Sequence, residues 1–113
     1  MSDKSVAQVL REARALIAGP ECYTNRHKAE TATGGHCSPQ HWSAWRFNTG
    51  GAIERVTGSP TLAPWNLYVM AAGQKLWNSA DIRALERWHP HADILRLMDL
   101  AIEMAEAGHA QAA

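Results

Sequence analysis

The sequence predicts an all-α protein: a single small domain of four main helices and one short helix, with a long polar loop between the first two. A chain of 113 residues has room for one domain. Apolar residues recur at helical spacing in five segments, and no run of alternating apolar and polar β-branched residues indicates a strand. The predicted helices cover residues 6–18, 39–57, 64–77, 80–87 and 90–107, and residues 19–38 form the loop.

The first and last helices have the clearest patterns. Ser2 or Ser5 can cap the first helix, and Gly19-Pro20 stops it. Pro90 suits the first turn of the last helix, and Gly108 ends it. The apolar faces consist of Val6, Val9, Leu10, Ala13, Leu16 and Ile17 in the first helix, and Ile94, Leu97, Met98, Ala101, Met104 and Ala105 in the last.

The second helix depends on how two adjacent glycines are interpreted. Ser38-Pro39 provides a cap followed by a proline at the first helical position. The apolar face then runs from Trp42 and Trp45 through Gly50-Gly51 to Val56, which predicts one continuous helix over 39–57. Each glycine costs such a helix about 1 kcal/mol relative to alanine.

The alternative is a break at the glycines, with a new helix capped by Asn48 or Thr49. The substitution Gly51→Ala separates the two, because it stabilises an exposed position of a continuous helix but is costly at a tight contact. With a break, a helix start near residues 49–52 becomes a place to look for a bound anion.

The two remaining helices follow a proline and a serine. Pro64 opens a segment in which Trp65, Tyr68 and Val69 keep helical register. A shorter helix follows Ser79 and runs towards Trp88.

Composition and charge exclude several classes of function. Eleven basic and eleven acidic residues give zero formal net charge, which argues against a nucleic-acid or anionic-membrane partner. No run approaches the roughly 18 apolar residues of a membrane-spanning helix, and the first residues lack the apolar stretch of a signal peptide. We therefore expect a cytoplasmic protein. No cofactor is expected, with zinc as the alternative. No enzyme motif is present, which argues against catalysis.

The loop before the second helix holds the strongest chemical candidates. Cys37 and His41 would lie on adjacent helical turns, and thiolates with imidazoles are the preferred ligands of zinc. The spacing matches no zinc-finger pattern, so two free thiols among surface histidines remain the alternative interpretation. Cys37 could also act as a nucleophile, since it precedes a predicted helix start and has His36 and His41 nearby as bases. The zinc-ligand candidates are Cys22, His27, His36, Cys37 and His41.

Tryptophan dominates the aromatic content, with five residues against one phenylalanine. Helical spacing places Trp42, Trp45 and Trp65 in the core. Trp77 and Trp88 lie at helix ends, where an exposed tryptophan favours a protein interface, and packing into the core or against a helix end is the alternative for each. His89 and His91 flank Pro90 beside them, so the interaction candidates are Trp77, Trp88, His89 and His91.

A central segment carries a resemblance to a known family. The run Arg46-Phe47-Asn48-Thr49-Gly50-Gly51-Ala52-Ile53-Glu54-Arg55-Val56, followed by a tryptophan and a proline before the last helix, resembles small helical proteins of unknown function from bacteria and phages. Asn48 stands where that family has a cysteine, and His89 stands where it tends to have an asparagine. The resemblance covers residues 5–107 and implies a helical fold, with a phage or mobile-element setting.

These observations favour a small helical protein–protein interaction module, with a protein partner or self-association, that modulates a host protein. One alternative is a metal-binding or thiol-dependent protein that uses the 22–41 loop. The other is a nucleic-acid-associated factor. It would use the scattered cations Arg26, Lys28, Arg46 and Arg55.

Overall fold

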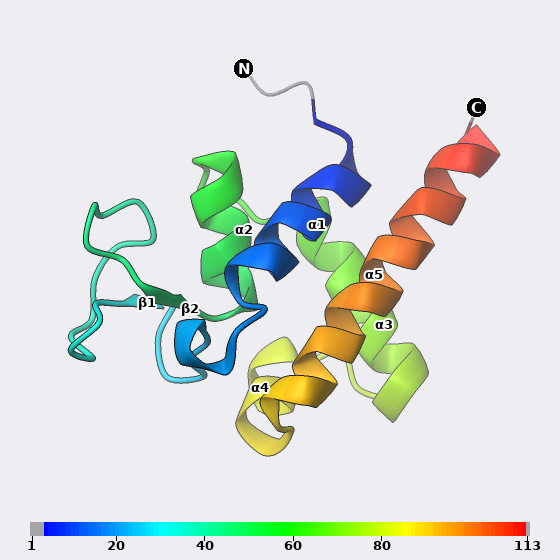
Figure 1. The fold of residues 1–113 in the computed structure, drawn as a ribbon. Coiled ribbons are helices and arrows are strands. Elements are labelled where there is room, and N and C mark those ends of the chain that lie inside the picture. Colours follow the sequence, from blue (N-terminus) through cyan, green and yellow to red (C-terminus); the bar gives the residue numbers. More distant parts are fainter. Residues whose placement is uncertain (1–3, 113) are drawn as a thin grey trace.

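The computed structural model describes residues 4–112, and their side chains as far as residue 108. Within that range it is mostly helical, so the all-α prediction is confirmed (Figure 1). The helices are α1 (Val6–Leu16), α2 (Thr49–Thr57), α3 (Trp65–Trp77), α4 (Ile82–Trp88) and α5 (His91–Ala112), with a 3-10 turn at Pro20–Cys22.

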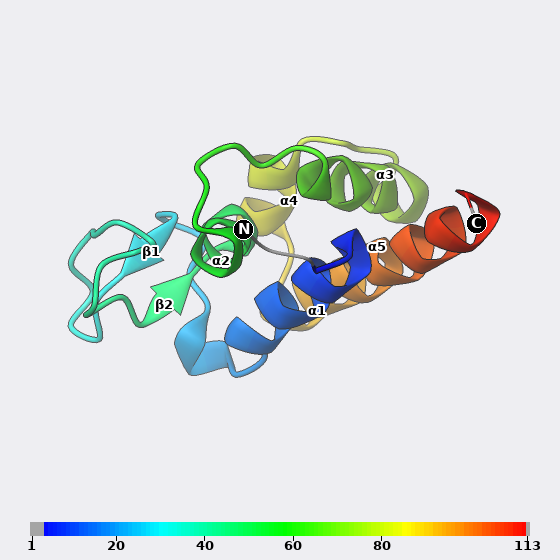
Figure 2. The same cartoon turned by 90° about the horizontal axis from the view of Figure 1, so that it is seen from above.

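The core lies where α1, α2, α3 and α5 pack together. In Figures 1 and 2, α1 and α5 lie side by side, with α3 against α5. Arg14 on α1 pairs with Asp99 on α5 at 2.6 Å, and the ring Nε2 of His91 lies 2.6 Å from the carbonyl oxygen of Ile17. The largest fully buried apolar side chains are aliphatic: Val9, Leu10, Ile17, Ile53, Val69, Ile94, Leu97 and Met98.

The helix starts and stops follow local capping signals. The Ser5 side chain accepts from the Gln8 N–H and begins α1, whereas Ser2 lies outside the described residues. The Asp81 side chain likewise caps α4 through the Ala84 N–H. Asn78 ends α3 in the left-handed conformation, at φ 55°. For α1, α3 and α4 the expected and observed boundaries differ by no more than two residues.

The segment between α1 and α2 is longer than predicted and contains two short strands. β1 (Ala29–Glu30) pairs antiparallel with β2 (Arg46–Phe47), in the register Ala29 to Phe47. This ribbon lies beyond α2, at the end opposite to the C-terminal turns of α5 (Figure 2). Strands of two residues are too short to show alternation in a sequence, which is why none was expected.

The prediction of a continuous helix over 39–57 is wrong. α2 begins only at Thr49, and the Asn48 side chain accepts a hydrogen bond from the Gly51 N–H. The alternative of a break, with Asn48 as the cap, is confirmed. Residues 38–45 form turns, because Ser38 and His41 close single turns that no helix continues.

The break also changes where the tryptophans lie. Without a helix to turn them inward, Trp42 and Trp45 are 86% and 51% exposed, so their predicted core placement is wrong. Trp65 is half-buried and packs against the core. The core is instead filled by aliphatic side chains.

The expected end of the last helix at Gly108 is also wrong, since α5 continues to Ala112. A Cβ on Gly108 would lie 3.1 Å from the Tyr68 hydroxyl oxygen of α3. The small residue therefore permits a close contact between two helices.

Candidate functional site

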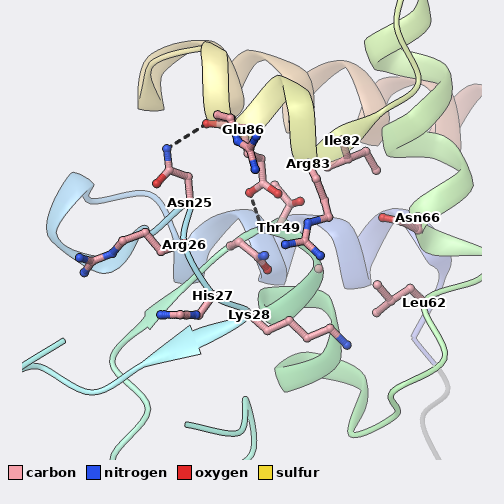
Figure 3. Close-up of a pocket in the computed structure, with 13 residues that line it drawn as sticks. Asn25, Arg26, His27, Lys28, Thr49, Leu62, Asn66, Ile82, Arg83 and Glu86 are labelled. Atoms are coloured by element: carbon pink, nitrogen blue, oxygen red, sulfur yellow. Dashed lines mark hydrogen bonds between the residues drawn. The ribbon is translucent and has the colours of Figure 1, made fainter. Parts of the chain in front are cut away.

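A pocket of about 560 Å³ opens where the start of α2, the α4 helix and the first residues of the loop meet (Figure 3). This volume is in the range of small-molecule sites, roughly 300–1,000 Å³. Arg83 reaches into the space from α4, Lys28 runs along the opposite side, and Leu62 and Asn66 close the far end. The lining residues belong to four different segments of the chain.

Glu86 forms the back of the pocket and is 3% exposed. Its Oε2 accepts hydrogen bonds from the Thr49 N–H at 3.0 Å and from the Tyr23 hydroxyl at 3.3 Å. Its backbone carbonyl accepts from the Asn25 side-chain amide at 3.2 Å. One residue of α4 therefore ties the start of α2 and the loop together.

The two carboxylate oxygens of Glu86 differ in their environment. Both hydrogen bonds go to Oε2, and Oε1 accepts none of good geometry from the described residues. The Thr49 hydroxyl oxygen is fully buried and also lacks a partner of good geometry there, although it lies near enough to favour the charged carboxylate. Both unpaired oxygens belong to residues that line the pocket.

Burial raises the pKa of Glu86 from 4.5 to about 7. The hydrogen bonds from Thr49 and Tyr23 and the charge of Arg83 act in the opposite direction without cancelling the effect. Burial, together with the charge of Glu86, also raises the pKa of Tyr23 above its ordinary value. Glu86 therefore changes its charge near neutral pH while Tyr23 keeps its proton.

Cationic side chains outnumber carboxylates around the pocket. Lys28 pairs with Glu54 at 2.9 Å, and Arg26 points away from the pocket towards the buried Glu30 (Figure 3). Arg83 and Arg87 form no salt bridge or hydrogen bond with any part of the chain that the structure describes. These two guanidinium groups lie one helical turn apart, and their N–H donors are available to a ligand.

The loop that carries Lys28 is held against α2 by backbone contact. The Asn48 N–H donates to the Lys28 carbonyl oxygen at 3.2 Å. A Cβ on Gly51 would overlap that oxygen and lie 2.6 Å from the carbonyl carbon. Only glycine therefore fits at position 51, which is a tight contact and not the exposed position that a continuous helix would give it.

The four interaction candidates lie near one another, around the junction of α4 and α5. The rings of Trp77 and His89 are 4.2 Å apart, and His89 also contacts Asp93 at 3.1 Å. His91 contacts the end of α1 and the Tyr23 ring. Trp88 is 79% exposed and is the member of the set with the most free surface.

The zinc candidates are not brought together. His27 and His36 stack with their rings 4.7 Å apart, whereas His41 contacts Ser43 within its own turn. Cys22 and Cys37 are free thiols. Among residues 4–108 no three His, Cys, Asp or Glu side chains are arranged to hold a metal ion.

The nucleophile hypothesis for Cys37 loses its structural basis. It depended on a helix beginning at position 39, and the chain forms only turns there. The helix start that the hypothesis placed beside the thiol lies instead at Thr49.

The cations that suggested nucleic-acid binding are engaged within the chain. Arg26 and Arg46 approach Glu30, which is fully buried. Arg55 donates to the carbonyl oxygens of Pro39 and His41. These groups stabilise the long loop and form no free basic patch.

Sequence reasoning missed Arg83, Glu86 and Arg87, which look like an ordinary solvated helix face. One signal was present: Glu86 lies four residues after Ile82 and next to Leu85, on the apolar side of α4. A carboxylate in an apolar stripe needs a partner, and that partner is the start of α2.

The comparisons with known proteins found no family model, curated protein or solved structure that matches this chain. The resemblance to small helical bacterial and phage proteins therefore stays a prediction. Over the described residues, none of the helices combines the length and apolar character needed to cross a membrane.

Proposed function

We propose that this protein is a small ligand-binding module that takes an organic anion in the pocket between α2 and α4. The observation that carries the proposal is the pair Arg83 and Arg87, two unpaired guanidinium groups lining a preformed pocket of about 560 Å³. Guanidinium groups bind carboxylates, sulfates and phosphates through paired N–H donors.

The remaining lining indicates the body of the ligand. Leu62 and Ile82 offer apolar contact, and Asn66 offers a side-chain amide that makes no hydrogen bond with the described residues. The matching ligand has a compact apolar part, one or two hydrogen-bonding groups and a single anionic end. Phenyl phosphate, phenyl sulfate and benzoate are simple probes of this class, and benzyl alcohol is the neutral counterpart.

We expect the three anionic probes to raise the melting temperature of the protein and benzyl alcohol to leave it unchanged. Binding to the folded state alone stabilises by mass action. Arg83→Ala should weaken the binding of phenyl sulfate about 10- to 100-fold, because a hydrogen bond to a charged group contributes roughly 1.5–3 kcal/mol. Isothermal titration calorimetry at low ionic strength measures the affinity.

Arg96→Ala is the matched control. Arg96 is exposed on α5 and makes no ion pair with the described residues, and it does not line the pocket. Equal binding by both variants and the wild type would mean that the anion binds elsewhere. Stabilisation by benzyl alcohol equal to that by benzoate would contradict the preference for an anion.

A second candidate function is the protein–protein interaction module expected from the sequence. The exposed tryptophans Trp42, Trp45 and Trp88 favour it, since tryptophan is enriched where interfaces form. From the resemblance described above, we further propose that such a module acts in the cytoplasm as a modulator of a host protein in a phage or mobile-element setting.

Self-association is the simplest form of this interaction. We expect sedimentation velocity to show a mass that rises with protein concentration, and Trp42→Ala to reduce that rise, because Trp42 exposes the largest fraction of its surface. Trp65→Phe, at a half-buried position, is the control. A monomer at every concentration would contradict self-association.

A further inference from the structure

We propose that binding of an anion in this pocket is coupled to the uptake of one proton by Glu86, so that the protein is a pH-dependent anion receptor. The inference rests on the proposed function and adds its regulation. The pocket lining is suited to anions, yet the carboxylate of Glu86 lies at its back.

One carboxylate oxygen of Glu86 accepts hydrogen bonds from other segments of the protein, and the other is available for a proton. Oε2 holds the start of α2 through the Thr49 N–H and also accepts from Tyr23. Oε1 accepts no hydrogen bond of good geometry from the described residues, so it is the site where a proton can be added without breaking either contact. Protonation of Oε1 turns an acceptor that repels an anion into an O–H donor that can bind it.

The charges around Glu86 set the direction of the coupling. Arg83 lies on the same helix, Tyr23 and Thr49 contact the carboxylate, and the lining also includes Arg26, His27, Lys28 and Arg87. The free protein already holds Glu86 near its midpoint at neutral pH, with a pKa of about 7. A bound anion raises that pKa further, because a second negative charge disfavours the carboxylate.

The affinity should therefore fall as the pH rises. Below the pKa that Glu86 has in the unliganded protein, its side chain is already protonated. No free energy of binding is then spent on protonating it. Above it, binding must also take up a proton from solution. Phenyl sulfate is the suitable probe, because its own charge does not change between pH 6 and pH 8.

We expect phenyl sulfate to bind the wild-type protein about five- to tenfold more weakly at pH 8 than at pH 6. Calorimetry at pH 7.5 in two buffers of different ionisation enthalpy should show uptake of more than about half a proton for each probe molecule bound. Glu86→Gln keeps an acceptor for the Thr49 N–H, so it should fold, bind with no proton uptake at pH 7.5, and exceed the wild-type affinity at pH 8.

His27 is the imidazole of the pocket lining, so its variant is the control. His27→Gln should keep the proton uptake at pH 7.5. If it loses the uptake and Glu86→Gln keeps it, the proton belongs to His27 and the inference about Glu86 is wrong.

The experiment also separates this inference from the proposed function. Binding of phenyl sulfate that needs Arg83 but has the same pH dependence in wild type and Glu86→Gln would overturn the coupling and leave the anion pocket in place. No binding at either pH would overturn both.

Discussion

Gly51→Ala is expected to lower the free energy of unfolding by about 3 kcal/mol, near the upper end of the usual cost of overpacking. The added Cβ would overlap the Lys28 carbonyl oxygen, and a backbone group held by the Asn48 N–H cannot rotate away as a side chain can. For a domain of this size we expect the melting temperature to fall by more than about 10 °C. Urea denaturation gives the free energy, and a thermal scan gives the temperature.

Gly50→Ala is the matched control, because it adds the same methyl group to the adjacent residue of the same helix turn. There the nearest atom is Leu62 Cδ1 at 3.2 Å, the flexible end of a side chain. The crowding offsets the gain in helix propensity, so we expect a change within about 1 kcal/mol of wild type. A Gly51→Ala variant as stable as wild type would show that the loop does not lie against α2.

The second large effect concerns stability and pH. The pKa of Glu86 is about 7 in the folded protein and 4.5 in the unfolded chain, so the folded state binds this proton more tightly. The contribution is complete below pH 4.5 and is lost as the pH rises through 7. It amounts to about 3 kcal/mol. We expect the free energy of unfolding of the wild type, relative to Glu86→Gln, to decrease by this amount between pH 4.5 and pH 8, measured by urea denaturation at each pH.

Glu103→Gln controls for the general effect of removing a carboxylate. Glu103 is exposed on α5 and forms no ion pair with the described residues. This variant should follow the wild type at every pH. If Glu86→Gln also runs parallel to the wild type, the carboxylate does not take up a proton in the folded state.

The sequence predicted the helices that have strong periodicity, and it failed where single contacts decide. α1, α3 and α5 carry long apolar faces, so their existence and most of their ends follow from spacing and capping. The path of the chain between α1 and α2 does not follow from spacing and capping. It depends on the backbone carbonyl of Lys28 packing against Gly51. Such a contact leaves no periodic signal, and the glycine pair fits a continuous helix and a broken one equally well.

The candidate site was predictable only in part. The helix start at Thr49 and its use as a place for an anion appear in the alternative of a broken helix. The packing of α4 against this helix start could not be predicted, because Glu86 is 37 residues away from Thr49 in the sequence. Nor does periodicity tell an arginine that is paired from one that is left free, so Arg83 and Arg87 could be recognised only from the folded arrangement.

The start of α2 and the loop are both tied to α4 through one residue, Glu86, and this has a consequence for motion. α4 has seven residues, too few to persist as an isolated helix in water. When it opens, Thr49 loses its acceptor, and Tyr23 and Asn25 lose theirs in the same event. Local unfolding should therefore release α4, the start of α2 and the first part of the loop as one cooperative unit, while the packed α1–α3–α5 layer stays protected from amide hydrogen exchange. An anion bound by Arg83 and Arg87 would lie in the pocket that all three segments line, so occupancy of the pocket would slow exchange over all three segments together.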